Sequence, residues 1–373
     1  MKQFQGSSYN ITADILGKVT FGCSNPFNRK DCILIKENTN KVPCGYKALV
    51  TNHTVISDKP YISTSHPLEE FHEGDVVLLS KSGEIKFLYE IQSKHNAVFV
   101  TERCNHRCIM CPQPPVVHEE DKTNFNIELI RLFDKNTESV GITGGEPTMI
   151  GDQLFEIIKQ INIACPNASI GILSNGVKFA DKDYALKLAK CRCCDMQIDI
   201  PIFSDIASIH NHIVGAHTFY KTIQGIYNLA QLGQRIGIRV VVHKLTYQRL
   251  PQLAGFIYHN LPFVEQVAFL QMETTGLAEK NLNELWIDPY DYNQQLLEAV
   301  EYLRDRDIPV YIFNSQLCIL PKSLHSIAMQ SITDWKDGYI SECQDCILKD
   351  KCAGLFTTNG VNISKHINKV EHS

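Results

Sequence analysis

From position 96 onward, short apolar runs alternate with longer segments whose apolar residues recur every three or four positions. The runs predict buried strands and the longer segments predict amphipathic helices. The expected strands span 97–102, 139–143, 169–174, 196–200, 236–243 and 266–271. The expected helices span 126–135, 153–163, 182–191, 219–232 and 250–260. Six strand–helix units predict an α/β fold, with a parallel sheet covered by helices.

The first 95 residues have a different pattern, in which helical periodicity is poor. Strands are expected within 31–37 and 46–52, and residues 73–90 have the pattern of two strands joined by a Lys-Ser-Gly turn. We therefore expect a small β-rich domain over residues 1–95, with the form of a partial barrel. The α/β region would cover 96–287.

The third region, 288–373, begins with Asp288, an expected N-cap, followed by Pro289. A helix to about 305 and a strand at 308–313 should follow. Four cysteines come next, the last three in a C-x2-C-x5-C spacing. They are Cys318, Cys343, Cys346 and Cys352. Four thiolates can ligate an iron–sulfur cluster fully, and zinc held by the same residues is the alternative.

Three further cysteines follow the first α/β strand. Cys104, Cys108 and Cys111 have a C-x3-C-x2-C spacing. Thiolates are soft donors that suit iron–sulfur clusters, and three of them leave one iron of a cubane open to a small molecule. Clustered core cysteines and a structural zinc site are the alternatives, although zinc usually takes paired C-x2-C units.

Polar or glycine-rich turns end the next strands, and the carboxyl ends of parallel strands share one face. The second strand runs into Gly144-Gly145-Glu146-Pro147. Its glycines permit close backbone approach, and its carboxylate suits an ammonium group. Later strand ends supply cofactor or substrate candidates whose alternative role is helix capping or packing. They are Ser174, Asn175, Asp199, Ser204, Asp205, His243, Lys244 and Glu273.

Composition narrows the function classes. The net charge of −5 gives no support for a nucleic-acid surface, and no apolar run could span a bilayer. Fourteen cysteines without a signal-peptide core indicate metal binding in the reducing cytoplasm. The remaining cysteines favour burial over zinc binding. They are Cys23, Cys32, Cys44, Cys165, Cys191, Cys193 and Cys194.

The cysteine triplet, followed about one strand–helix unit later by the Gly-Gly-Glu-Pro turn, resembles the radical S-adenosylmethionine (SAM) superfamily. This resemblance implies a partial (β/α)6 TIM-type barrel, a [4Fe–4S] cluster on Cys104, Cys108 and Cys111, and SAM on the open iron. It implies that the turn holds the SAM amino group, and that Ser174, Asn175 and Asp199 lie near SAM. The reaction implied is reductive cleavage of SAM to a 5′-deoxyadenosyl radical.

The C-terminal cysteines resemble the SPASM and twitch domains of this superfamily. A full SPASM pattern would have a cysteine where Phe356 stands, so one auxiliary [4Fe–4S] cluster is expected. The loop at 210–217 resembles the His-Asp-x-x-x-Gly loop of peptide-modifying members, with Asn211 replacing the aspartate; we expect it to serve loop packing.

Several segments are similar to HxsC-type maturases of the His-Xaa-Ser peptide system. They are 111–115, 316–321, 330–336 and 353–356. That resemblance implies a precursor peptide as substrate, a second radical SAM maturase as partner, and an electron donor such as flavodoxin or ferredoxin. The alternatives are a radical SAM enzyme for a small-molecule or nucleotide-derived substrate, a sulfatase-type maturase, and a zinc-stabilised binding protein without catalysis.

Overall fold

The structure is a computed structural model. It describes residues 2–22, 26–39, 41–191, 195–330, 338–356 and 362–371. Cys23, Cys193 and Cys194, and most of the 330–336 segment, lie outside the described residues.

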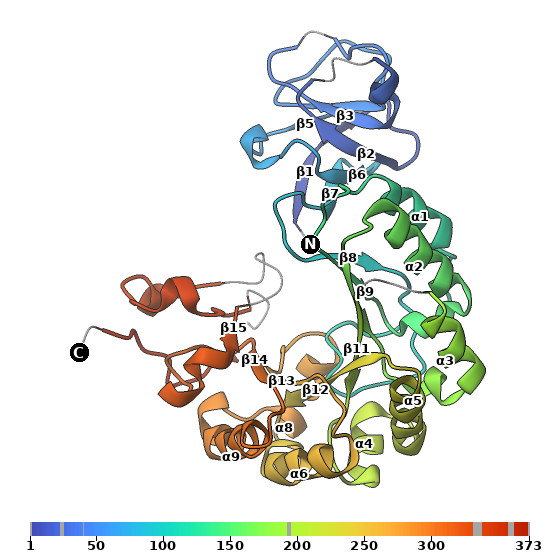
Figure 1. The fold of residues 1–373 in the computed structure, drawn as a ribbon. Coiled ribbons are helices and arrows are strands. Elements are labelled where there is room, and N and C mark those ends of the chain that lie inside the picture. Colours follow the sequence, from blue (N-terminus) through green and yellow to red (C-terminus); the bar gives the residue numbers. More distant parts are fainter. Residues whose placement is uncertain are drawn as a thin grey trace.

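The N-terminal region forms a closed barrel, where a partial one was expected (Figure 1). Its strands are β1 (Gln3–Tyr9), β2 (Ile15–Thr20), β3 (Cys32–Ile35), β4 (Ala48–Thr51), β5 (Tyr61–Thr64), β6 (Val76–Leu79) and β7 (Glu84–Tyr89). The short 3-10 helices η1 (Pro26–Asp31) and η2 (Leu68–Glu70) belong to the same region. The barrel closes because β1 pairs antiparallel with both β5 and β7. Alternate apolar side chains such as Ile85 and Phe87 fill its interior.

A second, fully parallel sheet follows in the order β15-β14-β13-β12-β11-β10-β9-β8. Its strands are β8 (Asn96–Phe99), β9 (Ser139–Thr143), β10 (Ser169–Leu173), β11 (Met196–Pro201), β12 (Arg235–Val242), β13 (Gln266–Gln271), β14 (Val310–Phe313) and β15 (Ala328–Met329). The six expected strands are all present. The strand expected at 308–313 is β14, and it pairs with β13, so the sheet continues past position 287.

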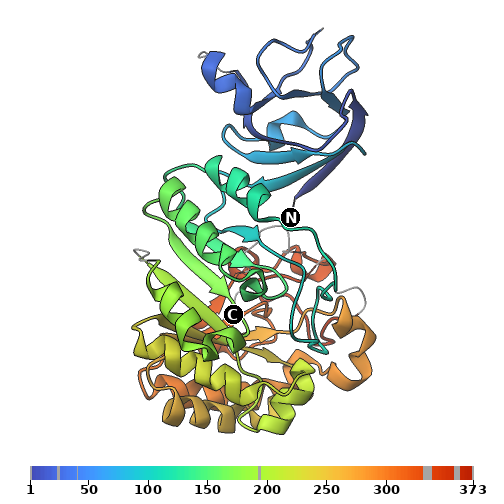
Figure 2. The same ribbon diagram turned by 90° about the vertical axis from the view of Figure 1, so that its right-hand side faces the viewer.

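Helices cover the convex face of this curled sheet (Figure 2). They are α1 (Thr123–Arg131), α2 (Gln153–Ala164), α3 (Lys182–Ala189), α4 (Ala207–Val214), α5 (Phe219–Gln231), α6 (Leu250–Asn260) and α9 (Asn293–Arg304). Short helical turns complete the region, namely η3 (Pro147–Ile150), η4 (Val177–Ala180), η5 (Tyr247–Arg249), α7 (Leu277–Lys280), α8 (Leu282–Leu285), η6 (Pro289–Tyr292) and η7 (Lys322–Ile327). The result is an α/β fold with a partial TIM-type barrel.

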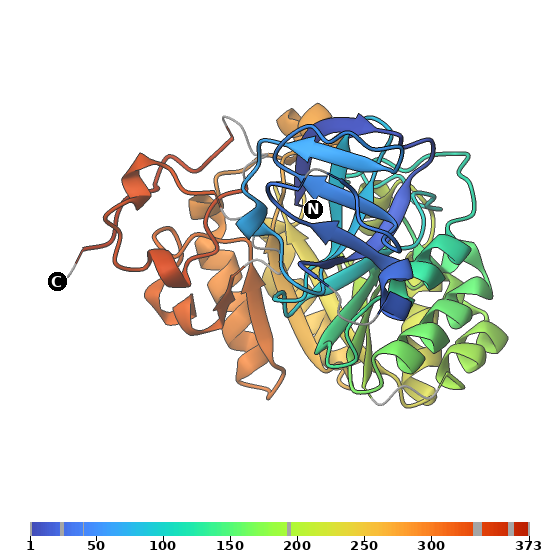
Figure 3. The same ribbon diagram turned by 90° about the horizontal axis from the view of Figure 1, so that it is seen from above.

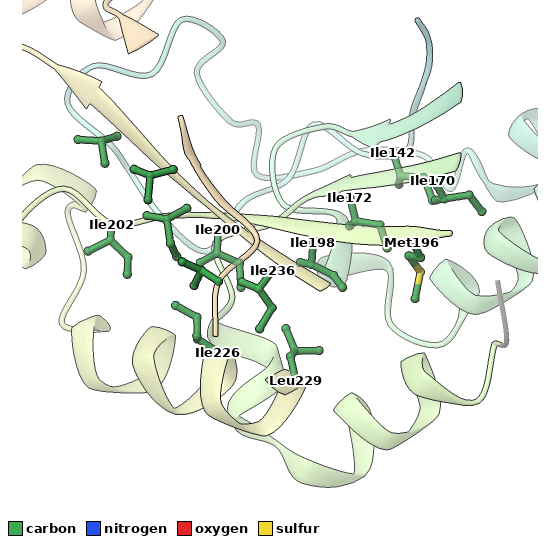
Figure 4. Packing of buried hydrophobic residues seen from close by; sticks show 14 of the residues in the cluster. Ile142, Ile170, Ile172, Met196, Ile198, Ile200, Ile202, Ile226, Leu229 and Ile236 are labelled. Atoms are coloured by element: carbon green, nitrogen blue, oxygen red, sulfur yellow. The ribbon is translucent and has the colours of Figure 1, made fainter. Parts of the chain in front are cut away.

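Side-chain alternation assigns one face of each strand to the core. Ile172, Ile198, Ile200 and Ile236 point toward the helices and pack with Leu229 of α5 (Figure 4). Successive side chains of a strand face opposite sides, so the residues between them line the concave face, which we call the lumen.

Helix α4 was not expected, because residues 210–217 were interpreted as a packing loop. Its apolar residues Ile209, Ile213 and Val214 pack together beside the cysteine triplet. Gly215 ends the helix in the left-handed conformation, with φ of 63°. The Asn211 side chain accepts hydrogen bonds from the backbone N–H groups of Thr218 and Phe219, at the start of α5.

Seen from above, the N-terminal barrel lies in front of the parallel sheet (Figure 3), and side-chain contacts join it to the start of that sheet. Tyr89, the last residue of β7, stacks on Phe133 with ring centroids 4.4 Å apart. Its hydroxyl lies 2.9 Å from the Thr137 hydroxyl. Leu16 and Val76 of the barrel belong to the same apolar cluster as the sheet core.

The C-terminal segment contains the short 3-10 helices η9 (Ser341–Cys343) and η10 (Lys349–Lys351). A bridge between Gly338 and Leu355 and a small cluster of Ile319, Leu355 and Ile367 hold it together. Across the parts of the chain that the structure describes, no helix is long and apolar enough to cross a membrane.

We expect acid to destabilise the fold through buried histidines. Burial lowers the pKa of His243 to about 3, so the unfolded chain takes up a proton at pH values where the folded chain does not. Stability should fall as the pH drops below about 6.5, with His243 contributing a loss of about 2 kcal/mol by pH 5.

Thermal unfolding at pH 7 and pH 5 measures this effect. His243→Asn keeps an acceptor for the Leu245 N–H, which lies 3.3 Å from His243 Nδ1, but it cannot titrate. The variant should lose less stability between the two pH values than the wild type. Exposed His217→Asn is the control and should keep the wild-type difference. Equal losses in all three proteins would contradict the prediction.

Candidate functional site

The cysteine triplet lies on a loop that begins where β8 ends, at the carboxyl edge of the sheet. Backbone hydrogen bonds from Arg107 N to Val214 O and from Ile109 N to Ile213 O, both 2.9 Å, tie it to α4. The last carbonyls of a helix lack partners within that helix, and here the cysteine loop supplies them. Asn281 Nδ2 donates to Ile109 O at 2.9 Å on another side. Cys104, Cys108 and Cys111 are therefore presented by a backbone held from several elements.

The glycine turn after β9 packs directly against this loop. Gly145 N donates to Thr101 O at 2.7 Å, and Glu146 N donates to Arg103 O at 2.8 Å. A Cβ added to Gly144 would lie 2.3 Å from Thr101 O, and one added to Gly145 would lie 2.3 Å from Arg103 O. The close approach that these glycines permit is thus made, in this structure, to the chain's own cysteine loop.

Glu146 is almost completely buried, with 1% of its surface exposed. Its carboxylate accepts hydrogen bonds from Thr148 N, Thr148 Oγ1, Ser174 Oγ and Asn175 N, at 2.6–3.0 Å. Burial raises the pKa of Glu146, and these donors oppose the shift. Pro147 is buried beside it at the first position of η3. The Glu146 side chain therefore links the turn after β9 to the end of β10.

Ser174 and Asn175, at the end of β10, are also buried and join the same network. Asn175 Nδ2 donates to Asn105 Oδ1 of the cysteine loop at 2.6 Å. Hydrogen bonds therefore connect the three segments predicted to form a site, namely the triplet loop, the Gly-Gly-Glu-Pro turn and the Ser174-Asn175 turn. Asn105 was not anticipated, although its position inside the triplet loop is a signal that could have identified it.

Asp199 of β11 lies on the lumen face, where Gln197 Nε2 donates to its carboxylate at 2.9 Å. Asp205 has a different role, because Arg249 binds both its carboxylate oxygens. That pair lowers the pKa of Asp205, which is partly buried, and links the end of β11 to the start of α6. Ser204 Oγ accepts from Ile206 N at 3.1 Å, as a turn residue.

His243 lines a small cavity together with Gln271 and Tyr292, under the 285–292 connection. Lys244 N donates to Leu285 O at 2.9 Å. The surroundings of His243 therefore fit a packing role better than a contact with substrate.

The three thiols of the triplet are partly buried, and burial raises their pKa values, to about 11 for Cys104. Metal binding would have to displace their protons. Among the described residues, no group of three or more His, Cys, Asp or Glu side chains is arranged to hold a single metal ion. A cubane cluster places each thiolate on a different iron, so its ligands stand further apart than those around one ion. A set of three thiols on one braced loop suits the [4Fe–4S] cluster that the radical SAM family implies.

The C-terminal cysteines meet at a second place. Cys318, Cys343, Cys346 and Cys352 line one enclosed cavity, together with Tyr339 and Leu355 among others. The Leu317 N–H donates to the Cys352 sulfur, and the Val370 N–H donates to the Cys346 sulfur, both at 3.4 Å. Burial raises the pKa values of Cys318 and Cys352. The fold thus gathers four thiols that are up to 34 positions apart in the sequence (352 minus 318).

Two further contacts brace the triplet loop and were not anticipated. Thr101 Oγ1 and the Glu102 N–H both donate to Glu119, at 2.5 and 2.9 Å. His106 Nε2 lies 2.9 Å from the Thr218 hydroxyl. Neither Glu119 nor Thr218 has a motif around it that marks it in the sequence.

We expect Gly145→Ala to destabilise the protein by about 2 kcal/mol, because the added methyl would overlap the Arg103 carbonyl. Iron bound per chain after anaerobic reconstitution should fall with it, since the cysteine loop must shift. Thermal unfolding and iron analysis measure the two effects.

Gly255→Ala in α6 is the matched control, since its new Cβ would have no neighbour closer than 3.9 Å. This control should raise stability by about 0.5–1 kcal/mol, because alanine favours a helix. A Gly145→Ala protein with wild-type melting temperature and iron content would refute the contact.

Comparison with curated proteins finds similarity over part of the chain. A GTP 3′,8-cyclase from Petrotoga mobilis is 30% identical over 194 residues, covering 49% of this chain and 58% of that protein. Molybdenum cofactor biosynthesis protein 1 from Bos taurus is 29% identical over 156 residues, covering 39% of this chain and 24% of that protein. The chain therefore spans less than two thirds of these relatives.

Solved structures also align. SuiB from Streptococcus suis bound to S-adenosylmethionine is 16% identical, with a TM-score of 0.48 over 59% of this chain and 50% of that one. Native anSMEcpe with bound AdoMet is 18% identical, with a TM-score of 0.46 over 58% and 62%.

The family model described as the radical SAM superfamily matches residues 98–257. This range contains the cysteine triplet, the Gly-Gly-Glu-Pro turn and the strands β9–β12. Residues 98–257 of this chain are therefore similar to the radical SAM superfamily.

Proposed function

We propose that this protein is a radical SAM enzyme whose site is the carboxyl edge of β8–β11. One observation carries the proposal: hydrogen bonds join the triplet loop, the Gly-Gly-Glu-Pro turn and the Ser174-Asn175 turn into one unit. Cys104, Cys108 and Cys111 would hold the [4Fe–4S] cluster. When bound and reduced, the cluster supplies the electron that cleaves SAM to a 5′-deoxyadenosyl radical.

The chain's own groups would orient SAM beside that cluster. Backbone carbonyls of the Gly144-Gly145 turn would receive its ammonium group, and Glu146 would supply the negative charge behind them. Ser174 and Asn175 would fix the depth of the pocket, and Asp199 on the lumen face would accept hydrogen bonds from ribose hydroxyls. The protein thereby positions the cofactor and excludes water.

A second cluster on Cys318, Cys343, Cys346 and Cys352 is part of the proposal. All four line one cavity, and four thiolates complete a cubane without an open iron. Such a cluster would accept the electron left on a substrate radical. A twitch-like domain around it agrees with the non-cysteine residue Phe356, which is buried at the end of this segment.

We propose a ribosomally made precursor peptide as substrate, modified as in the His-Xaa-Ser system. The segment similarities to HxsC-type maturases and the auxiliary cysteine set support this class. A second radical SAM maturase would act beside this protein, and flavodoxin or ferredoxin would reduce the clusters. The cytoplasm would supply these partners.

A nucleotide-derived small molecule is the second candidate substrate. The 30% identity with a GTP 3′,8-cyclase over 194 residues favours it. Those alignments reach at most about half of this chain among the relatives described above, so they say little about the residues that would select a substrate. A zinc-stabilised binding protein is the candidate outside catalysis, and a colourless, zinc-loaded product of anaerobic purification would favour it.

The first test is SAM cleavage. Anaerobically reconstituted protein with dithionite and SAM should form 5′-deoxyadenosine, measured by mass spectrometry. The triple Cys104/Cys108/Cys111→Ala variant should form none, because no thiolate remains to hold the cluster. Cys44→Ala removes an exposed thiol of the barrel and should behave as the wild type. No product from cluster-loaded wild type, with or without substrates, would reject the proposal.

The same assay separates the two substrate classes. A peptide with His-Xaa-Ser repeats should raise 5′-deoxyadenosine formation and change in mass, whereas GTP should do neither. Stimulation by GTP with a new nucleotide product would replace the peptide proposal with the second candidate.

The auxiliary cluster is tested by iron content. Wild-type protein should bind about eight irons and the double variant Cys343/Cys346→Ala about four, because the triplet keeps its three thiolates whereas the auxiliary site keeps only two. The double variant should still cleave SAM. Unchanged iron, or zinc recovered in place of four irons, would contradict the auxiliary cluster.

A further inference from the structure

Arg239 stands out on the lumen face of β12. Its neighbours in sequence, Ile238 and Val240, are buried in the helix-facing core, so Arg239 projects to the opposite, concave side. In register it lies between Pro201 of β11 and Ala268 of β13. The exposure of the residue as a whole is intermediate, so Arg239 is not sealed in the core as Ile238 and Val240 are.

The surroundings give this guanidinium no partner. Pro201 and Ala268 offer no side-chain acceptor, although an arginine carries five N–H donors. Within the ranges that the structure describes, no hydrogen bond or ion pair of the Arg239 side chain is formed. The acidic group whose charge acts on Arg239 is Asp199, which lies one pleat away and accepts a hydrogen bond from Gln197.

A guanidinium without a hydrogen-bonded partner at this position lowers the stability of the folded protein. Burial lowers the pKa of Arg239, and the charge of Asp199 only partly offsets the shift. A cation surrounded by protein without a hydrogen-bonded counter-charge is unfavourable, and methionine of similar volume would remove that cost. Arg249, by contrast, is paired with Asp205. A site that keeps such a charge is a candidate for binding an anion.

We propose that Arg239 binds a carboxylate of the peptide substrate, an acidic side chain or the C-terminal group, and so positions the peptide in the lumen. The inference rests on the proposed function and deepens it by naming the charge of the substrate.

A carboxylate of the substrate fits better than the other available anions. The residues proposed for the cluster and for the SAM ammonium group lie at the ends of β8, β9 and β10, and β12 is two strands beyond β10, roughly 10 Å along the sheet. Only Asp199 of β11, proposed for the ribose hydroxyls, lies on a strand next to β12. A nucleotide triphosphate would need several cations, whereas Arg239 has Asp199 as its nearest charged neighbour. A single guanidinium can bind one carboxylate through two parallel hydrogen bonds.

The experiment is isothermal titration of the reconstituted protein under nitrogen. The probe is N-acetyl-glutamate amide, and the neutral N-acetyl-glutamine amide is its match. The wild type should bind the glutamate probe at least tenfold more tightly than the glutamine probe. Arg239→Met should lose this preference, and Arg239→Lys should keep part of it. Arg235→Met, at the exposed start of the same strand, should leave it intact.

Two further measurements separate the possible roles of Arg239. If the residue is structural, Arg239→Met lowers the melting temperature; the proposal requires an unchanged or raised one. If the residue binds the carboxylate of SAM, the variant loses SAM affinity tenfold or more and the glutamate probe competes with SAM; the proposal requires SAM affinity within twofold of the wild type. Either alternative result overturns the inference.

Failure of the proposed function gives a different pattern. The protein would then form no 5′-deoxyadenosine even though the glutamate probe bound through Arg239. Equal binding of both probes by the wild type would overturn the inference while leaving SAM cleavage intact.

Discussion

The site depends on two backbone segments that meet without side chains between them. Gly145 donates to Thr101 and Glu146 donates to Arg103, and methyl groups on the glycines would collide with the same carbonyls. This contact joins the ends of β8 and β9, which bring the cysteine loop and the turn to one edge. Glu146 then links this contact to the end of β10 through two hydrogen bonds, from Ser174 and Asn175. Asn175 in turn donates to Asn105 of the cysteine loop.

Because the polar groups of this site are buried, each must have a hydrogen-bond partner, and this requirement restricts the site to one conformation. Glu146 would be costly inside the protein if any of its oxygens lacked a donor, and each has at least one. The cysteine loop similarly completes the end of α4, whose carbonyls at 213 and 214 accept N–H groups from Arg107 and Ile109. Each element therefore satisfies the unpaired groups of another, and the loop conformation follows from many weak bonds with compatible geometry.

The sequence predicts much of this architecture, and the exceptions have physical reasons. Strands β9 and β13 match their expected bounds, because short apolar runs bordered by glycine or polar residues give clear signals. Helix α4 was missed because two histidines and an asparagine obscure its apolar face, which the cysteine loop covers. Closure of the N-terminal barrel depends on pairing between β1 and β7, and that contact is distant in sequence. Glu119 and Thr218, which contact Thr101 and His106, were missed for the same reason, because each contact joins positions that are distant in the sequence.

The junction at Tyr89 also sets how the two sheets can move. Only six residues, 90–95, connect β7 to β8, while the Tyr89–Phe133 stack and the Tyr89–Thr137 contact lie across the boundary. A flexible tether would let the barrel sample a volume that grows with linker length. Here the connection is short and packed, so the barrel acts as a fixed extension of the sheet, and the distance from its surface to the cysteine loop is a constant of the fold.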